Sequence, residues 1–198
     1  SKSWRNSPNW IRENYQRNCL LKGFKDSDDD DLIMISDIDE IPNPKMINKF
    51  EKKNKYACFV QKNFQSKINL LNASEPNWFG TRICVKKFIK SPMWLKNIKI
   101  KKKNFWKFFQ PNPPQLILEG GWHFSFLKTS EGISKKIMSY AHQEYNNSNY
   151  NNIDLIQKRV DEKRDILDRD FIYKKIDLDS TFPDFIIKNK DKLKAWIL

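Results

Sequence analysis

Cysteine and histidine are scarce in this chain of 198 residues. It has three cysteines, which are widely separated and form no CxxC pair, and two histidines. An odd number of isolated cysteines argues against a disulfide framework and against a structural zinc site. We therefore expect Cys19, Cys58 and Cys84 to be small buried or half-buried side chains in a reducing compartment.

Long apolar runs are also lacking. No stretch approaches the ~20 apolar residues that a helix needs to span a bilayer, and no signal peptide is recognisable. No repeat of fixed period occurs either. The expected location is the cytoplasm or, for a microbial protein, the periphery of a membrane.

Acidic residues are outnumbered by basic ones. There are 24 Asp and Glu against 37 Lys and Arg, and the formal net charge of +13 favours an anionic partner. A nucleic acid, a phosphorylated small molecule such as a nucleotide, and an anionic membrane surface all qualify. Hydrophobic residues make up 39% of the chain, which indicates a folded protein, and its length fits one domain over residues 1–198.

Two carboxylates follow the most apolar segment of the chain. Residues 32–36 predict a buried strand, and Asp37 and Asp39 come directly after it. Residues two apart on an extended segment point the same way, so both side chains can reach one divalent cation if the strand geometry persists through Asp39. A short Asp-x-Asp is also common in solvated loops and helix caps, and that interpretation stays open.

The residues after this pair predict a helix. Asn43 is a typical N-cap, Pro44 suits the first helical position, and the helix is expected to cover 45–53. The local order is thus strand, acidic loop and helix. Ligands of open α/β sheets bind at the carboxyl ends of strands, which is where the acidic pair falls.

The whole chain predicts an α/β fold with a central mixed sheet flanked by helices. Helices are expected at 8–22, 45–53, 129–141, 153–164 and 183–196. Strands are expected at 32–36, 56–60, 64–71, 82–85, 116–119 and 122–126. Residues 86–115, rich in lysine and aromatics and interrupted by proline, predict a short helix or irregular excursion and a loop.

Both histidines are candidate metal ligands. An ion held by two carboxylates accepts a neutral imidazole as well, and Mn²⁺ tolerates that mixture. His123 lies between Trp122 and Phe124, however, and a histidine among aromatics is often a satisfied core residue. His142 is expected at a helix end, where the dipole favours a cationic ring without any function.

Two glutamates are candidates for a general base. Glu119 is the better placed, because Gly120 and Gly121 beside it let a substrate come close to the backbone. Glu144, which follows His142, is the competing candidate. The simpler alternative for Glu119 is an exposed acid at the end of a strand.

Basic residues occur in two places that suit an anionic ligand. Arg17 lies on the first expected helix, where it can bind diphosphate oxygens or pair with Glu13 at a spacing of four. The segment Lys99–Phe109 mixes lysines with large aromatics. Such a segment stacks bases, contacts an anionic membrane, or is a solvated edge over core aromatics. No pattern of a nucleic-acid-binding module accompanies it, so nucleic acid is the less favoured partner.

Four motifs in this order resemble glycosyltransferase family 17, whose best-known members are β-1,4-mannosyl-glycoprotein N-acetylglucosaminyltransferases. They span about 130 residues and are Glu13-x-x-Gln16-Arg17-Asn18, Ile33 to Pro42, Gly120 to Ser125, and Ser139 to Tyr145. Asp165 to Arg169 is compatible with the same pattern. The resemblance runs over most of the chain from about Trp4 onward.

The resemblance implies a GT-A-like, metal-dependent, inverting glycosyltransferase that uses a UDP-sugar, with N-acetylglucosamine as the expected sugar and a glycan hydroxyl as acceptor. Asp37 and Asp39 form the Asp-x-Asp metal site for Mn²⁺ or Mg²⁺, with Asp39 the surer direct ligand. Arg17, Asp37 and Trp122 are expected to contact the donor. On this model the ion would offset charge on the leaving UDP, and a carboxylate such as Glu119 would deprotonate the acceptor.

One departure from the family concerns the N-terminal side. Family members carry a longer region before the Gln-Arg-Asn motif, including the first strand of the nucleotide-binding half. The chain is therefore expected to be a fragment or a shortened protein with an altered donor pocket. The alternative function is a non-catalytic binding module that holds nucleic acid or an anionic membrane surface through its basic and aromatic residues.

Overall fold

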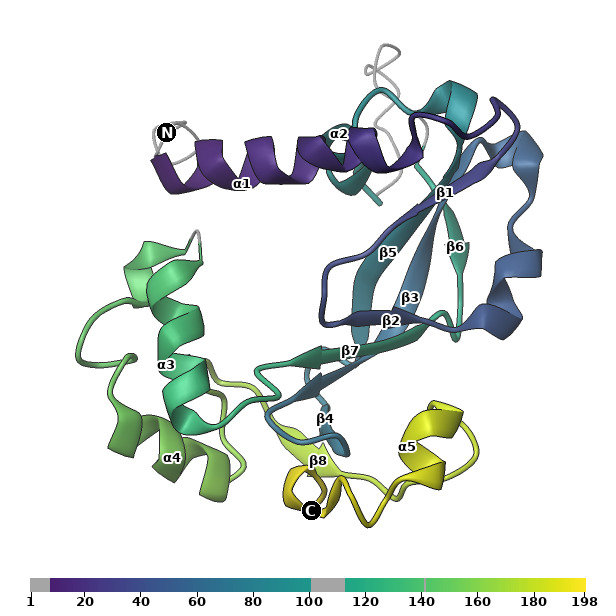
Figure 1. The fold of residues 1–198 in the computed structure, drawn as a ribbon. Coiled ribbons are helices and arrows are strands. Elements are labelled where there is room, and N and C mark those ends of the chain that lie inside the picture. Colours follow the sequence, from purple (N-terminus) through teal and green to yellow (C-terminus); the bar gives the residue numbers. More distant parts are fainter. Residues whose placement is uncertain (1–7, 101–112, 141) are drawn as a thin grey trace. The chain divides into compact units, whose positions relative to one another are not determined.

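The computed structural model describes residues 8–100, 113–140 and 142–198. These residues form an α/β fold with helices and a mixed sheet, as expected (Figure 1). The chain divides into two compact units. Unit 1 comprises Ser1–Gln61 and Phe79–Gly121, and unit 2 comprises Lys62–Trp78 and Trp122–Leu198.

Unit 1 contains the acidic pair. Its helices are α1 (Pro8–Asn18), α2 (Pro92–Lys96) and the 3₁₀ helices η2 (Cys19–Phe24), η3 (Pro44–Lys49), η4 (Lys52–Asn54) and η5 (Lys86–Phe88). Its strands are β1 (Leu32–Ile35), β2 (Glu40–Pro42), β6 (Gln115–Ile117) and parts of β3 (Tyr56–Gln65) and β5 (Asn77–Val85). Strand β1 pairs antiparallel with β5, and β6 pairs parallel with β3, so this part of the sheet is mixed.

Strand β1 is covered on both faces. Ile33 and Ile35 lie in one hydrophobic cluster with Tyr56, Cys84, Leu95 and Ile98. Met34, on the opposite face, packs against a second cluster around Phe59 and Ile83. Burial on both faces explains why this strand has a continuous apolar sequence and not an alternating one.

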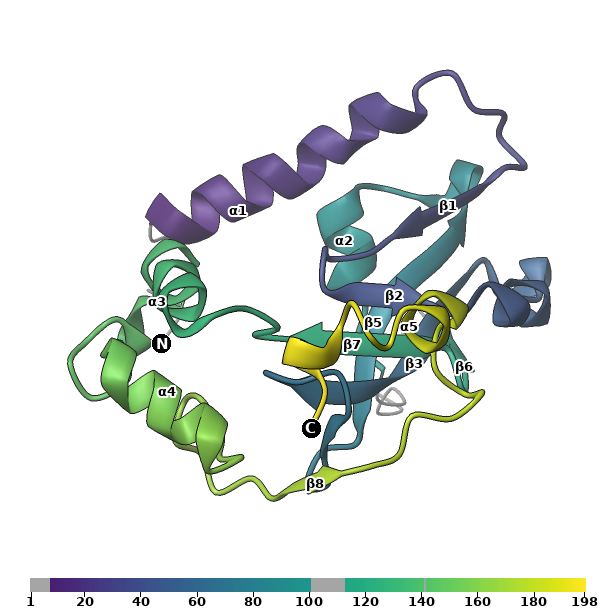
Figure 2. The ribbon, with the colours of Figure 1, turned by 60° about the horizontal axis from the view of Figure 1, so that its bottom comes forward.

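Unit 2 has two hydrophobic clusters of its own. Its helices are α3 (Ser130–Ser139), α4 (Ile153–Asp161), α5 (Asp184–Lys188) and the 3₁₀ helices η6 (Gln143–Tyr145) and η7 (Lys194–Trp196). Strand β7 (Gly121–Ser125) pairs parallel with β3, and β4 (Leu70–Asn72) pairs antiparallel with β3 and with β8 (Tyr173–Lys175). Helices α3 and α4 pack side by side (Figure 2), and their residues Ile133 and Ile156 form a buried cluster with Phe126. The other cluster surrounds Phe64, Phe124 and Phe182.

Most of the expected strands and the expected cap at Asn43 are confirmed. Strand β1 covers 32–35, and the strands expected at 56–60, 82–85 and 122–126 fall in β3, β5 and β7. Asn43, Thr129 and Asn152 each accept a hydrogen bond from a backbone N–H of the helix that follows. The cap at Asn43 was predicted from the sequence, because a cap depends only on residues a few positions apart.

Four expected elements differ from the structure. The helix expected at 45–53 is two 3₁₀ helices, because Phe50 and Glu51 between them are extended. The strand expected at 64–71 is split, since the chain turns at Ser66, whose φ is +57°. The last expected helix consists of α5 and η7 with a break between them. Helix α1 ends at Asn18 and continues as η2, so Gly23 lies inside a 3₁₀ helix and does not end the helix before it.

Gly120 and Gly121 are packed against the chain's own backbone. A Cβ on Gly120 would lie 2.8 Å from the Cβ of Phe59, and one on Gly121, whose φ is +134°, would lie 2.1 Å from the carbonyl oxygen of Ile41. The N–H of Gly120 donates to Val60, and its carbonyl accepts from the N–H of Asn43 at 2.8 Å. Backbone therefore comes close to these two glycines. The backbone that does so belongs to β3 and to residues 41–43, which follow the turn that carries Asp37 and Asp39.

Within the described residues, none of the helices combines the length and the apolar character needed to cross a bilayer.

Candidate functional site

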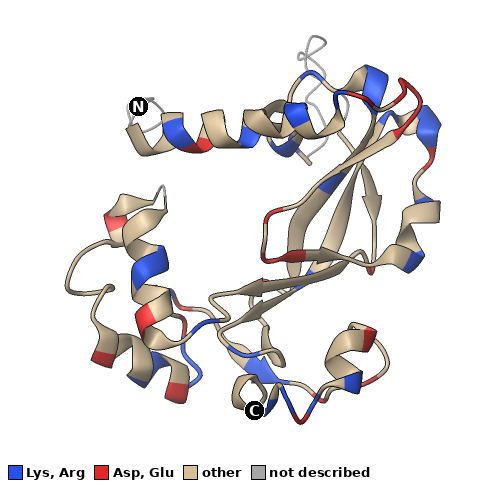
Figure 3. Ribbon diagram, in the orientation of Figure 1, with Lys and Arg blue, Asp and Glu red and all other residues tan. Residues whose placement is uncertain are grey.

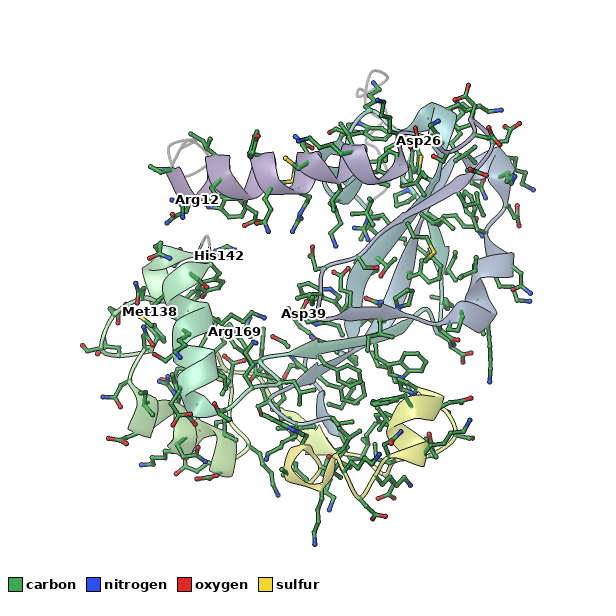
Figure 4. All side chains as sticks on the ribbon, viewed as in Figure 1. Arg12, Asp26, Asp39, Met138, His142 and Arg169 are labelled. Atoms are coloured by element: carbon green, nitrogen blue, oxygen red, sulfur yellow. The ribbon has the colours of Figure 1, made fainter. Side chains whose placement is uncertain are left out.

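Asp37 and Asp39 lie on a turn between β1 and β2, where Figure 3 shows acidic residues and Figure 4 labels Asp39. The strand ends at Ile35, and the turn closes with a hydrogen bond of 3.0 Å from the N–H of Glu40 to the carbonyl of Asp37. Both acids are half-buried, whereas Ile38 between them is fully exposed. The condition that strand geometry persists through Asp39 is therefore not met, and a turn holds the pair.

Two cations hold the carboxylate of Asp37. Nη2 of Arg17 lies 2.9 Å from Oδ1, and Nζ of Lys96 lies 3.2 Å from Oδ2. Arg17 also contacts Oε1 of Glu13 at 3.3 Å, so the expected pairing with Glu13 is confirmed, and the contact with diphosphate oxygens stays a prediction. Arg17 and Asp37 were predicted from the sequence to share a site, and the structure brings them together.

Glu40 is the buried centre of this arrangement. Its side chain is 1% exposed, both of its carboxylate oxygens lie 2.9 Å from Nζ of Lys96, and Oε2 accepts the backbone N–H of Asp37 at 3.0 Å. Lys96 is itself only 9% exposed. Sequence reasoning missed both residues, although the position of Glu40 directly after the acidic pair was a usable signal.

Short helices bring the two cations to Asp37. The side chain of Asn18, at the end of α1, accepts the backbone N–H of Met93 in α2 at 3.2 Å. Ser91 caps α2 by accepting the N–H of Trp94 at 3.0 Å. Arg17 precedes Asn18 and Lys96 ends α2, so the packing of α1 on α2 places both side chains over the acidic turn.

No protein-family model, curated protein or solved structure matches the chain. The geometry and chemistry of the residues therefore carry the functional argument. Hard divalent cations prefer carboxylate oxygens, which Asp37 and Asp39 supply, and Mg²⁺ is often bound by one or two carboxylates together with substrate phosphates. In the part of the chain that the structure describes, no cluster of three or more His, Cys, Asp or Glu side chains is arranged to hold a metal ion.

Glu119 lies in unit 1, on the turn after β6. It is exposed, its φ is +53°, and its carbonyl accepts the side-chain N–H of Asn43 at 3.2 Å. The space beside the two neighbouring glycines is occupied by other parts of the chain. The expectation that they leave room for a substrate at the backbone is therefore wrong, and only the exposed carboxylate of Glu119 remains available for chemistry.

Trp122 and His123 are buried in unit 2. Trp122 lies in the cluster of Phe64 and Phe124, so packing accounts for this residue, which was expected to contact the donor. Nδ1 of His123 lies 2.9 Å from Oδ1 of Asn63. The imidazole also stacks on Trp78, with ring centroids 4.1 Å apart and an angle of 11°. His123 thus has the environment of the satisfied core histidine that its aromatic neighbours indicate.

His142 and Glu144 are exposed and hydrogen-bonded to each other in unit 2. Nδ1 of His142 lies 2.8 Å from Oε1 of Glu144. Partial burial would raise the pKa of Glu144, but a backbone hydrogen bond and His142 outweigh it and lower the pKa. A lowered pKa weakens a general base. Helix α3 ends at Ser139, so the expectation that His142 ends a helix is wrong.

The basic and aromatic segment Lys99–Phe109 falls almost entirely outside the described residues, which resume at 113. Its expected role in binding nucleic acid or an anionic membrane stays a prediction.

Proposed function

We propose that the chain is a metal-dependent, inverting glycosyltransferase that transfers a sugar from a UDP-sugar to a hydroxyl of a glycan. The resemblance in the sequence supplies the expected sugar, N-acetylglucosamine. The observation that supports the proposal is the acidic turn, where two half-buried carboxylates lie at the carboxyl end of β1 and one of them contacts two cations. Carboxylates and cations at one strand end suit a metal ion and a diphosphate together.

The donor set fits the proposed ion. Asp37 and Asp39 would hold Mg²⁺ or Mn²⁺ through carboxylate oxygens, and phosphate oxygens of the donor would complete its coordination. When bound, the ion supplies a Lewis acid that offsets charge on the departing UDP. Arg17 and Lys96 add two positive charges beside the same turn, and guanidinium and ammonium groups stabilise phosphate oxygens as charge develops on them.

Glu119 is the proposed general base. It belongs to the same unit as the acidic turn, and its backbone is hydrogen-bonded to Asn43, four residues after Asp39. Its carboxylate takes the proton of the acceptor hydroxyl, whose oxygen attacks the anomeric carbon as the bond to the diphosphate breaks. Glu144 is less suited, because its hydrogen bond with His142 helps to lower its pKa.

The test is a calorimetric titration of the full chain with UDP, in Mn²⁺ and in EDTA. We expect binding to be tighter by roughly tenfold or more in Mn²⁺, and Asp39→Asn to abolish that difference, because it removes a direct metal ligand. Asp26→Asn is the matched control. It makes the same change of charge at an exposed acid before β1, in the same unit.

Metal-independent UDP binding, or an equal loss in Asp26→Asn, would contradict the proposal. The alternative, a basic binding module, predicts another pattern. Its affinity for nucleic acid or anionic vesicles would ignore Mn²⁺ and the Asp39 substitution and fall steeply with salt.

A further inference from the structure

Asp37 lies where an anion would bind. We infer that Arg17 and Lys96 form the diphosphate subsite of the donor, and that the carboxylate of Asp37 fills this subsite until the donor and its metal ion arrive. The inference deepens the proposed function and rests on it, because it names the residues that hold the phosphates. It also explains why the carboxylate of Asp37, which is expected to bind a metal ion, contacts two cationic side chains of its own chain.

The geometry resembles that of a bound anion. One oxygen of Asp37 contacts Nη2 of Arg17 at 2.9 Å, and the other contacts Nζ of Lys96 at 3.2 Å. A phosphate group presents pairs of oxygens in a similar arrangement, so one phosphate can span the two nitrogens that one carboxylate spans here. Arg17 presents a planar group that suits phosphate oxygens, and Lys96 presents a point charge.

The carboxylate of Asp37 can move away from Arg17 and Lys96 without leaving either cation unpaired. If it turns toward a metal ion, Arg17 keeps Glu13 at 3.3 Å and Lys96 keeps Glu40 at 2.9 Å. Because removing the sole partner of a buried cation is costly, these second carboxylates make the exchange feasible. Asp37 is also the more accessible partner of Lys96, with its side chain 35% exposed against 1% for Glu40.

A tethered carboxylate competes with any anion that arrives from solution. Its effective concentration is high because it belongs to the same chain, so free phosphate groups bind weakly while Asp37 fills the subsite. A metal ion that draws Asp37 away would free the subsite and bring in the phosphates. Neutralising Asp37 should therefore improve the binding of a diphosphate when no metal is present, although the same change removes a metal ligand.

The experiment is a calorimetric titration with inorganic pyrophosphate in EDTA at constant ionic strength. We expect Asp37→Asn to bind pyrophosphate roughly tenfold or more tightly than the wild type, because coupling between competing groups commonly spans that range. Asp26→Asn, which removes the same charge at an exposed site, should change the affinity by less than about twofold. Adding Arg17→Gln to Asp37→Asn should remove the gain.

Three results would overturn the inference: no gain in Asp37→Asn, an equal gain in Asp26→Asn, or a gain that survives Arg17→Gln. If Asp37→Asn does not fold, the wild type at millimolar pyrophosphate gives the decisive comparison. Arg17→Gln should then weaken binding and Arg12→Gln, an exposed arginine of the same helix, should not; equal affinities would refute the subsite. The UDP titration tests the metal independently, so either proposal can fail alone.

Discussion

Glu40 joins the acidic turn to helix α2. One side chain accepts the N–H of Asp37 and contacts Nζ of Lys96, while being almost fully buried. A buried carboxylate paired with a cation contributes little by itself to stability, but removing one partner leaves the other charge buried and unpaired. The residue after the acidic pair therefore supports the turn, whatever the pair binds.

We expect Glu40→Gln to destabilise unit 1 by about 1–3 kcal/mol, because Lys96 would lose its more buried partner and keep only Asp37, at 3.2 Å. The free energy of unfolding from urea titration, followed by circular dichroism, measures the effect. Glu51→Gln is the control, since Glu51 pairs with Lys53 at the surface. Its loss should leave the urea midpoint unchanged. Equal stability of the two variants would contradict a supporting role for Glu40.

The sequence predicted some of these residues and not others. Asp37 and Arg17 were found because a carboxylate after an apolar strand and a cation on an amphipathic helix are local patterns. Lys96 was not, because its role depends on the packing of α2 on α1 through Asn18, which no short motif encodes. The aromatic neighbours of His123 indicated that it could be buried, whereas no local pattern showed that unit 2 buries Trp122.

At the scale of elements, the segment after α4 is fixed by one buried acid. Asp165 accepts hydrogen bonds from Arg169 at 2.8 Å, from the hydroxyl of Tyr173 at 2.6 Å and from the amide of Gln65 at 3.1 Å. These bonds join the segment to β8 and β3. Burial would raise the pKa of Asp165, but the bonds from Arg169 and Tyr173 outweigh it, and the pKa lies below its ordinary value of 3.8.

A lowered pKa in the folded state means that the ionised form of Asp165 stabilises the fold. This contribution is complete above 3.8 and is lost as the pH falls through the lower, folded pKa. We therefore expect Asp165→Asn to be much less stable than the wild type at about pH 6, and the difference to shrink toward about pH 3 as the wild-type carboxyl takes up its proton. Urea titrations across this range measure the difference. A gap that stays constant would refute the linkage.

Elements were predictable where local chemistry decides them. The cap at Asn43 and the buried strand β1 follow from neighbouring residues. The split between β3 and β4 was missed, because the left-handed backbone of Ser66 interrupts a run that has high strand propensity. The 3₁₀ form of η3 and η4 was missed as well, since few apolar side chains there select an α-helix over a tighter turn.

At the scale of the whole molecule, the two units have separate hydrophobic cores, and cysteine thiols occur in only one of them. All three cysteines belong to unit 1. Cys58 in β3 and Cys84 in β5 are buried, and burial raises their pKa to about 11 and about 12, whereas Cys19 is half-buried, as the sequence predicted. Thiol reactivity therefore reports on unit 1 alone.

We expect one thiol per folded chain to react quickly with a thiol reagent at about pH 8, because only a reachable thiol that can ionise is an effective nucleophile. Cys19→Ser should remove this fast reaction. Cys58 and Cys84 should react only as urea opens unit 1, at a rate that follows the population of the open form. Two or three fast thiols in the native protein would contradict the packing around β3 and β5.

The contact of Gly120 and Gly121 with the chain behind the acidic turn uses main-chain atoms almost exclusively. The side chains of residues 37–39 can therefore be exchanged without loosening that attachment, whereas Glu40 also supports the turn through Lys96. Turns that bind other ions can be grafted at this position, provided that both glycines and Glu40 are retained.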